Sequence, residues 1–204
     1  MAVHPIVITG EPVLHRPAQR VEVFDDALAQ LVADMMETTT AAHGVGLAAP
    51  QIGVGLRIFV WDMANDDGVP RRGVLINPML KLARLRDGAP DPDTESEGCL
   101  SVPGENFPLR RSERAEVFGY DVTGEPVNFV ATGWFARCMQ HETDHLNGML
   151  YVDRLDAKWS RKAKKAIRKA GWGTPGHSWM PGVDADPFGH DDTADPLGHD
   201  HTAD

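Results

Sequence analysis

The stretch "QHETDHLNG" at residues 140–148 is the most informative part of this 204-residue chain. On a helix, residues four apart lie almost above one another, so His141 and His145 can hold one metal ion from a single rigid element. Glu142 lies one step round the helix, where it can reach a water on that ion without being a ligand. The pattern H-E-x-x-H is typical of hydrolytic sites, in which the metal acidifies a water and the glutamate takes up its proton.

The preceding residues indicate that this helix is buried. Segment 134–147, "WFARCMQHETDHLN", contains neither Pro nor Gly, and Gly148 follows it where a helix C-cap is expected. Its first six residues are mostly apolar. A buried pair of ionisable side chains needs partners, which favours a metal over chance occurrence of a short pattern.

A catalytic metal site of this kind needs a third protein ligand and keeps one position for water. The chain has two cysteines, too few for the disulfide framework of a small secreted protein. Cys99 in "EGCLS" (97–101) is the favoured ligand, because Gly98 beside it allows the backbone to approach closely. Cys138 is the competitor. It lies three residues before His141 on the same helix, and a pocket wall or the core suits it better.

The rest of the pattern predicts an α+β fold with antiparallel sheets packed around the central metal-binding helix, and with N-terminal and C-terminal helices. Strands and helices do not alternate regularly, which argues against a doubly wound parallel sheet. The expected elements are a helix at 25–43 capped by Asp25 or Asp26, strands at 56–61 and 73–78, a hairpin about "TG" (123–124), and a last helix at about 157–170.

Composition predicts a cytoplasmic protein without a membrane segment. Hydrophobic residues make up 42% and charged residues 25% of the chain, and no apolar run approaches the roughly 20 residues that span a bilayer. The first ten residues show no targeting pattern.

The net charge of −10 is unevenly spread. Residues 158–169 hold seven Lys or Arg and no acid. Such a run is either a solvated helix face or a basic patch that can bind nucleic acid.

One folded domain followed by a tail of different composition is expected. Residues 1–170 form the catalytic domain, including the basic helix. Residues 171–204 are rich in Gly, Pro, Asp and His, and contain the tandem repeat "ADPFGHDDT" (185–193) and "ADPLGHDHT" (194–202). This tail has little apolar surface to bury, so it is expected to be largely disordered, at least after residue 183.

Three motifs together resemble the peptide deformylase family: "GVGLAAPQ" (44–51), "EGCLS" (97–101) and "QHETDHLNG" (140–148). The resemblance covers roughly residues 1–183. It implies an α+β fold around the third motif, and an enzyme that hydrolyses the N-terminal formyl group from N-formylmethionine of newly synthesised proteins and releases formate. N-formylmethionyl nascent peptides are thus the expected partners. The resemblance also offers a second interpretation of the basic helix at 157–170, which is contact with ribosomal RNA or a ribosomal protein.

The resemblance also implies the roles of individual residues. One divalent metal would be held by Cys99, His141 and His145. Fe²⁺ is expected, while Zn²⁺, Co²⁺ and Ni²⁺ also suit one thiolate and two imidazoles. Glu142 would be the general base and then the acid. The oxyanion would receive hydrogen bonds from the side-chain amide of Gln51 and the backbone N–H of Leu100.

The peptide substrate is expected to lie extended, pairing with main chain near Gly46 and Gly98. Val45, Trp134 and Cys138 are expected walls of the methionine pocket, although core packing is an equally good interpretation for Trp134.

Two charged residues have open roles. Glu97 either pairs with an arginine such as Arg111 or orients the Cys99 loop. Arg137 stands where many relatives carry an apolar residue, so the resemblance does not define the details of the methionine pocket.

Two other functions fit these motifs less well. A general metallopeptidase cutting internal bonds fits the cysteine ligand and the "GVGLAAPQ" loop less well than a small formamide site does. A non-catalytic, ribosome-associated module would be expected to have lost at least one of the five site residues Gln51, Cys99, His141, Glu142 and His145, and all are present.

Overall fold

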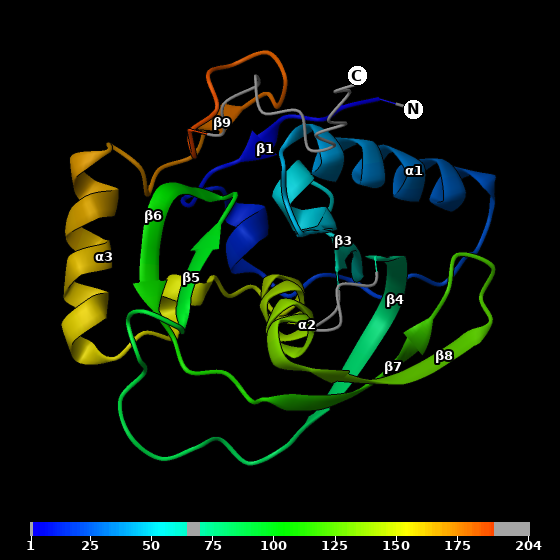
Figure 1. The fold of residues 1–204 in the computed structure, drawn as a ribbon. Coiled ribbons are helices and arrows are strands. Elements are labelled where there is room, and N and C mark those ends of the chain that lie inside the picture. Colours follow the sequence, from blue (N-terminus) through cyan, green and yellow to red (C-terminus); the bar gives the residue numbers. More distant parts are fainter. Residues whose placement is uncertain (1, 65–69, 190–204) are drawn as a thin grey trace, which may run out of the picture.

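The computed structural model describes residues 2–64 and 70–189, and in this part of the chain helix α2 lies at the centre of three antiparallel sheets (Figure 1). The three α-helices of these residues are α1 (Asp26–Ala41), α2 (Gly133–Leu146) and α3 (Ala157–Lys169). Short 3-10 helices span Pro12–His15, Ala49–Ile52 and Tyr151–Asp153. The predicted α+β fold with N-terminal and C-terminal helices is confirmed.

The largest sheet has the strand order β2-β3-β4-β7-β8. Its strands are β2 (Gly46–Ala48), β3 (Ile58–Ala64), β4 (Pro70–Leu82), β7 (Arg114–Tyr120) and β8 (Pro126–Thr132). A second sheet pairs β5 (Ser96–Cys99) with β6 (Val102–Pro108), and a third pairs β1 (Ile6–Val7) with β9 (Ser178–Trp179). Every one of these strand pairs is antiparallel.

Strands β3 and β4 extend further than the sequence pattern predicts. The polar residues after the expected strand at 56–61 continue the pairing, and Asp62 lies opposite Arg72. The Arg72 Nε atom is 3.6 Å from a carboxylate oxygen of Asp62, so a cross-strand pair of opposite charges supports this part of the hairpin.

Helix α1 begins where its cap was predicted. The Asp25 side chain accepts a hydrogen bond from the Leu28 N–H at 2.9 Å, which satisfies one of the free donors of the first turn. Leu28, Val32 and Met35 of its apolar face are buried in a core with β3.

Helix α2 is positioned by apolar contacts on the side that faces the large sheet. Phe135, Ala136, Met139 and Leu146 are buried in one cluster with residues of β3, β4 and β7. The helix ends at Leu146 with Asn147 as its C-cap, so the glycine expected at the cap follows one residue after it; the φ of Gly148 is +74°. A side chain there would meet the backbone of Arg16, so glycine is required both by conformation and by space.

The chain remains packed on the body of the fold after residue 170, the expected end of the catalytic domain. Strand β9 pairs with β1, and Trp179 is buried. The end of the repeat, residues 190–204, lies outside the described residues, so the expectation of disorder there and the division at residue 170 remain predictions. No described helix is long and apolar enough to cross a membrane.

Candidate metal centre and active site

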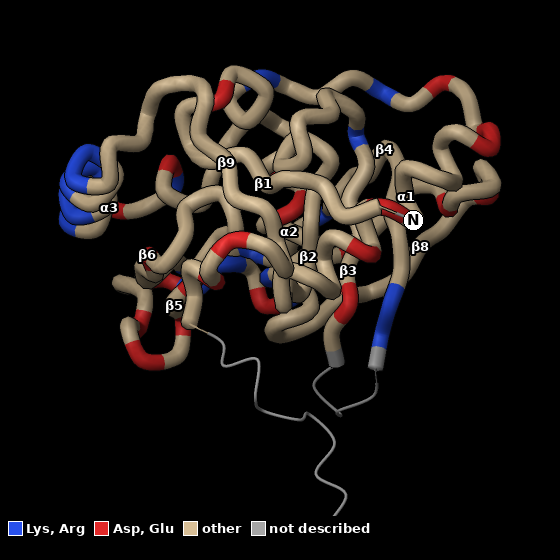
Figure 2. Tube along the Cα trace, turned by 90° about the horizontal axis from the view of Figure 1, so that it is seen from above, with Lys and Arg blue, Asp and Glu red and all other residues tan. Residues whose placement is uncertain are grey.

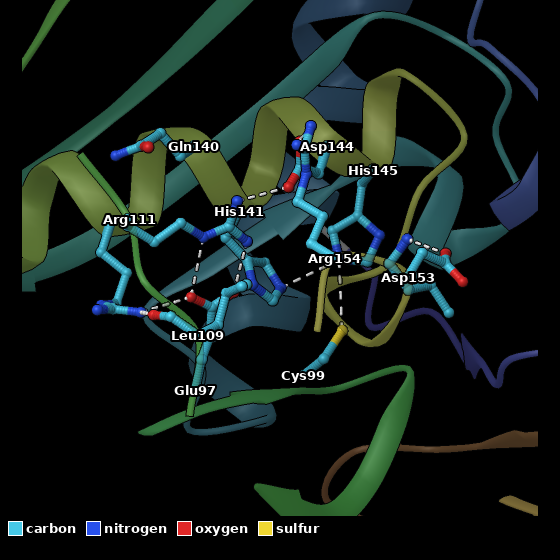
Figure 3. Close-up of polar contacts among 12 residues, drawn as sticks. Glu97, Cys99, Leu109, Arg111, Gln140, His141, Asp144, His145, Asp153 and Arg154 are labelled. Carbon is cyan, nitrogen blue, oxygen red and sulfur yellow. Dashed lines mark hydrogen bonds and ion pairs between the residues drawn. The ribbon is translucent and has the colours of Figure 1, made fainter. Parts of the chain in front are cut away.

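Three donor atoms converge below α2, from two elements far apart in the sequence (Figure 3). The Cys99 Sγ atom, at the end of β5, lies 3.3 Å from the Nε2 atom of His145. The two imidazole Nε2 atoms, from His141 and His145, are 3.2 Å apart. All three donors lie within 4.8 Å of one another, so the favoured set of Cys99, His141 and His145 is brought together.

The three donors fit a small divalent ion. Tetrahedral coordination, with metal–nitrogen bonds of about 2.0–2.1 Å and metal–sulfur bonds of about 2.3 Å, puts the donors roughly 3.3–3.6 Å apart. His141 donates from Nδ1 to the carboxylate of Glu97, which turns its Nε2 toward the other two donors. Burial alone would lower the pKa of His141, but Cys99 and Glu97 hold it well above its usual value, so a metal that binds at Nε2 would displace a proton. Burial lowers the pKa of His145 well below its usual value, so this imidazole is neutral and offers a lone pair.

Glu97 holds His141 in place. One carboxylate oxygen accepts from the His141 Nδ1–H at 2.7 Å, while Arg111 donates to both oxygens at 2.6 and 3.1 Å. Burial alone would raise the pKa of Glu97, but hydrogen bonds from His141 and Arg111 lower it overall, so the group is ionised. Glu97 thus has the predicted arginine partner, and the group that it orients directly is the His141 ring.

The network continues along α2 to Asp144. Arg111 also donates to Asp144 at 2.6 Å, and Arg154 pairs with the other oxygen of that carboxylate. Asp144 lies on the same helix as both histidines. Arg111 therefore ties strand β5 to the metal-binding helix through three charge-assisted hydrogen bonds, two to Glu97 and one to Asp144.

Glu142 faces the same region and is 3% exposed. Burial raises its pKa to about 7, and among the described residues its Oε2 atom has no hydrogen-bond partner. Gly46 of β2 lies directly against it, and a Cβ atom there would be 2.5 Å from Oε1 of Glu142. The glycine in the "GVGLAAPQ" loop is thus needed for close approach of β2 to the carboxylate.

Gln51 is held in one orientation. Its Oε1 atom accepts a hydrogen bond from the Ala48 N–H at 2.8 Å, so its NH₂ group must point the other way. That group lies 3.4 Å from the Ser101 hydroxyl and 3.8 Å from Cys99 Sγ. The side-chain amide therefore directs its donors toward the Cys99 sulfur atom and the Ser101 hydroxyl.

These groups open on one cavity of about 530 Å³. Every predicted catalytic and substrate-binding residue lines it: Val45, Gly46, Gln51, Gly98, Leu100, Trp134, Cys138 and Glu142. Cys99 and His141 also contribute to the wall, while His145 lies behind them and is 1% exposed. Cys138 lies beside Gly46, with its thiol 3.9 Å from the Val45 carbonyl oxygen, and belongs to the cavity wall rather than to the donor set.

Some wall residues were not predicted. Met63, Asn106 and Phe188 all line the cavity. Asn106 pairs with Gly98 across the β5–β6 sheet, and its side chain lies over the space that a Cβ atom at Gly98 would fill. A cross-strand partner is not visible in a single strand's sequence. Phe188 lies in the first copy of the repeat, and no local pattern connects it with the other cavity residues, all of which lie far from it in the sequence.

Arg137 is the residue that departed from the expected pattern, and its position explains how a cation fits in this wall. Its Nη1 atom donates to Glu97 at 2.9 Å and to the Leu109 carbonyl oxygen at 2.8 Å. The guanidinium stacks 5.0 Å from the ring centre of Trp134, which is 53% exposed. The charge is thus neutralised by a buried carboxylate and covered by an aromatic ring.

A helix-borne H-E-x-x-H motif beside a cysteine donor, inside antiparallel sheets and open to one cavity, defines a metal-dependent hydrolase. The comparisons with known proteins name its kind. Residues 3–161 match the family described as polypeptide deformylase, and the chain belongs to this family, which confirms the predicted resemblance.

Its relatives cover nearly the whole chain. A peptide deformylase of Mycolicibacterium paratuberculosis is 56% identical over 93% of this chain and 100% of its own length, and that of Mycobacterium marinum is 54% identical over the same shares. The crystal structure of a peptide deformylase from Legionella pneumophila matches with a TM-score of 0.72 at 37% identity, over 83% of this chain and 96% of that one. The Synechococcus elongatus enzyme, solved in complex with actinonin, matches with a TM-score of 0.70 at 39% identity, over 82% and 85%.

Proposed function

We propose that this deformylase removes the formyl group from N-formylmethionine of newly made proteins through five residues: Gln51, Cys99, His141, Glu142 and His145. The single observation that carries the proposal is that Gln51, Cys99, His141 and Glu142 line one cavity, while the three metal-donor atoms, including that of His145, lie within 4.8 Å of one another.

Cys99, His141 and His145 would hold one divalent metal, which when bound lowers the pKa of a coordinated water from about 16 toward about 7. Glu142 takes the proton at its carboxylate. With a pKa near 7 it is a base matched to neutral pH, and it later passes the proton to the leaving amine.

Two fixed donors would stabilise the oxyanion of the tetrahedral intermediate. Gln51 is supported in this role because Ala48 holds the oxygen of its side chain and so directs the nitrogen inward. The Leu100 backbone N–H would be the second donor. One such donor is typically worth about 10²–10³ in rate, because it needs no reorganisation when charge develops.

The choice of a formyl group follows from the space around the reacting carbon. A formyl carbon carries only hydrogen, whereas an internal peptide carbonyl carries a side chain and more backbone. The substrate would lie extended between Gly46 and Gly98, and Val45, Trp134 and Cys138 would enclose its methionine. Asn106 and Phe188 also line the cavity, where they would contact residues that follow the methionine.

A comparison of substrates tests the activity. The protein is purified anaerobically with Fe²⁺ and offered formyl-Met-Ala-Ser, Met-Ala-Ser and longer unformylated peptides. Formate release from the formylated peptide alone is expected. Cleavage of internal bonds would contradict the proposal, and so would inertness with every metal.

We propose Fe²⁺ as the physiological ion. One thiolate and two imidazoles also suit Zn²⁺, Co²⁺ and Ni²⁺. The apoprotein would be loaded with each ion in turn without oxygen, and kcat/KM compared with the metal content of protein isolated from its native cells. Zinc in the native protein, together with higher activity of the zinc form, would overturn this assignment.

We also propose that α3 docks on the ribosome in the cytoplasm, where formylated chains emerge. Its seven Lys and Arg side chains are all exposed and gather at one end of the molecule (Figure 2). Ala163 is buried, and Trp159, Ala166 and Ile167 pack beside it, which leaves the basic face free. Contact with ribosomal RNA would be sensitive to salt.

The test is charge reversal at Lys162, Lys164, Lys165 and Arg168. Loss of ribosome co-sedimentation at low salt is expected, with unchanged cleavage of formyl-Met-Ala-Ser. The control reverses four exposed cations elsewhere, which are Arg16, Arg20, Lys81 and Arg84. Unchanged co-sedimentation of the α3 variant, or equal loss in the control, would refute the docking role.

A further inference from the structure

The indole of Trp179 holds the peptide unit that joins Leu100 to Ser101. The Trp179 Nε1–H donates to the Leu100 carbonyl oxygen at 3.0 Å. At the other end of the same peptide unit, the Ser101 N–H donates to Cys99 Sγ at 3.4 Å. One peptide plane is thus fixed between a buried tryptophan and the cysteine donor.

The segment that carries Trp179 is itself firmly attached. Strand β9 pairs with β1, with Trp179 opposite Ile6, and the two strands lie side by side in Figure 1. Trp179 is 8% exposed. Two residues after β1, the Thr9 N–H donates to the Ser101 carbonyl oxygen at 2.9 Å, so both strands of this small sheet hold the loop after Cys99.

Packing alone does not require the indole hydrogen bond. Trp61 is also buried, and its Nε1 has no partner among the described residues. The fold therefore accommodates one indole N–H without a partner, whereas that of Trp179 is aimed at a carbonyl beside the site. A hydrogen bond at a carbonyl oxygen also polarises the peptide unit and strengthens the bond that its N–H makes.

We infer that Trp179 is a positioning residue for the reaction, acting through this peptide unit on Cys99 and Leu100. By holding the plane, it maintains the N–H···S bond that draws electron density from the thiolate. Because Leu100 lies between Cys99 and the fixed plane, the same contact aims the Leu100 N–H into the cavity. This second effect rests on the proposed function, in which that N–H binds the oxyanion.

Trp179 lies beyond residues 3–161, the part that matches the family. The C-terminal segment would therefore be part of the catalytic unit, because it completes the support of a loop that the matched region supplies. Substitution of Trp179 should therefore change the electronic properties of the Cys99 sulfur atom as well as kcat.

The test compares Trp179→Phe with Trp172→Phe. The first removes the N–H and keeps an aromatic ring. The second is a matched control on a partly buried tryptophan of the same segment, which packs on the same core. Both proteins are loaded with Co²⁺, and the thiolate-to-cobalt charge-transfer absorption is recorded beside kcat and KM for formyl-Met-Ala-Ser.

For Trp179→Phe we expect the absorption to move to longer wavelength, because a thiolate with a weaker hydrogen bond gives up electrons more easily. We expect kcat to fall roughly 10-fold, less than the 10²–10³ typical of deleting an oxyanion donor, with KM within twofold. Trp172→Phe should leave the absorption, kcat and KM unchanged. A folded Trp179→Phe protein with the wild-type absorption and kcat would overturn the inference.

If Trp179→Phe does not fold, Trp179 is replaced site-specifically by β-(3-benzothienyl)alanine. This residue keeps the two-ring shape and has sulfur in place of the N–H, so the same shifts are expected and their absence refutes the role. A wild-type protein that releases no formate would contradict the proposed function instead. The cobalt absorption would still decide whether Trp179 acts on the thiolate.

Discussion

Glu97 accepts a hydrogen bond from Nδ1 of His141 at 2.7 Å, and so fixes which nitrogen of that ring faces the metal site. Replacement by Gln gives a weaker acceptor and leaves Arg111 and Arg137 without their shared anion. We predict that Glu97→Gln lowers metal affinity by about 10- to 100-fold. Competition with a chelator measures it.

The matched control for this prediction is Glu95→Gln. Glu95 is a buried glutamate two residues earlier, and it pairs with Arg110 rather than with a histidine. This control should keep wild-type metal affinity. Equal affinity in all three proteins would show that Glu97 does not orient the ligand.

Glu95 itself should give a pH-dependent contribution to stability. Hydrogen bonds from Arg110 hold the pKa of Glu95 below its usual value, so the ionised form stabilises the folded state. At pH 7 we predict that Glu95→Gln lowers the free energy of unfolding by about 1–3 kcal/mol. The difference is present above the usual pKa of about 4.3 and disappears as pH falls through the lowered, folded-state pKa.

Urea unfolding of both apoproteins across this pH range measures the effect. Chelator is present at every pH, so that metal loss does not contribute. A difference between the two proteins that stays constant down to pH 3 would exclude the ion pair as its source.

Gly46 should be intolerant of even one methyl group. A Cβ atom there would lie 2.5 Å from Glu142 Oε1 and 3.0 Å from Cys138 Sγ. We predict that Gly46→Ala displaces the carboxylate and lowers kcat by about 10²-fold, the typical cost of a misplacement of about 1 Å. Gly55→Ala is the control, since the nearest atom to its added methyl is 3.9 Å away. Steady-state kinetics that give the same kcat for both variants would contradict this steric account.

The proposed oxyanion role of Gln51 can be separated from its structural role. We predict that Gln51→Leu lowers kcat by about 10²–10³ while metal content is retained. Gln140→Leu is the matched control, because Gln140 is also buried and bonds the backbone of Ser112, and it does not line the cavity. Both variants should lose stability, which thermal unfolding measures. If kcat fell by the same factor in both variants, Gln51 would not act as the oxyanion donor.

Local spacing was enough to predict the donor helix. The four-residue separation of His141 and His145 fixes their common face on any helix, and the apolar stretch before them indicates its burial. Strong helix signals at α1 and α3, including the Asp25 cap, were predicted for the same reason. Cys99 was predicted as a ligand from its motif. No local pattern places it near a helix that begins more than 30 residues later.

Contacts that depend on strand pairing were not predictable from local pattern. Strands β1, β2 and β9 have two or three residues, too few for a period of two to appear. The sharing of Glu97 by Arg111, Arg137 and His141 needs β5 beside α2, and the Trp179 contact needs β9 beside β1. Tertiary structure alone brings these groups together.

The central claim is that Glu142 moves the proton at a metal held by Cys99, His141 and His145. Glu142→Gln tests it most directly, because the change keeps the size of the side chain and removes the base. Metal content and formate release from formyl-Met-Ala-Ser would be measured on the same preparation. We predict about one bound metal per chain and a rate of formate release that is lower by a factor of about 10²–10⁴. A variant that retains its metal and releases formate at the wild-type rate would contradict it.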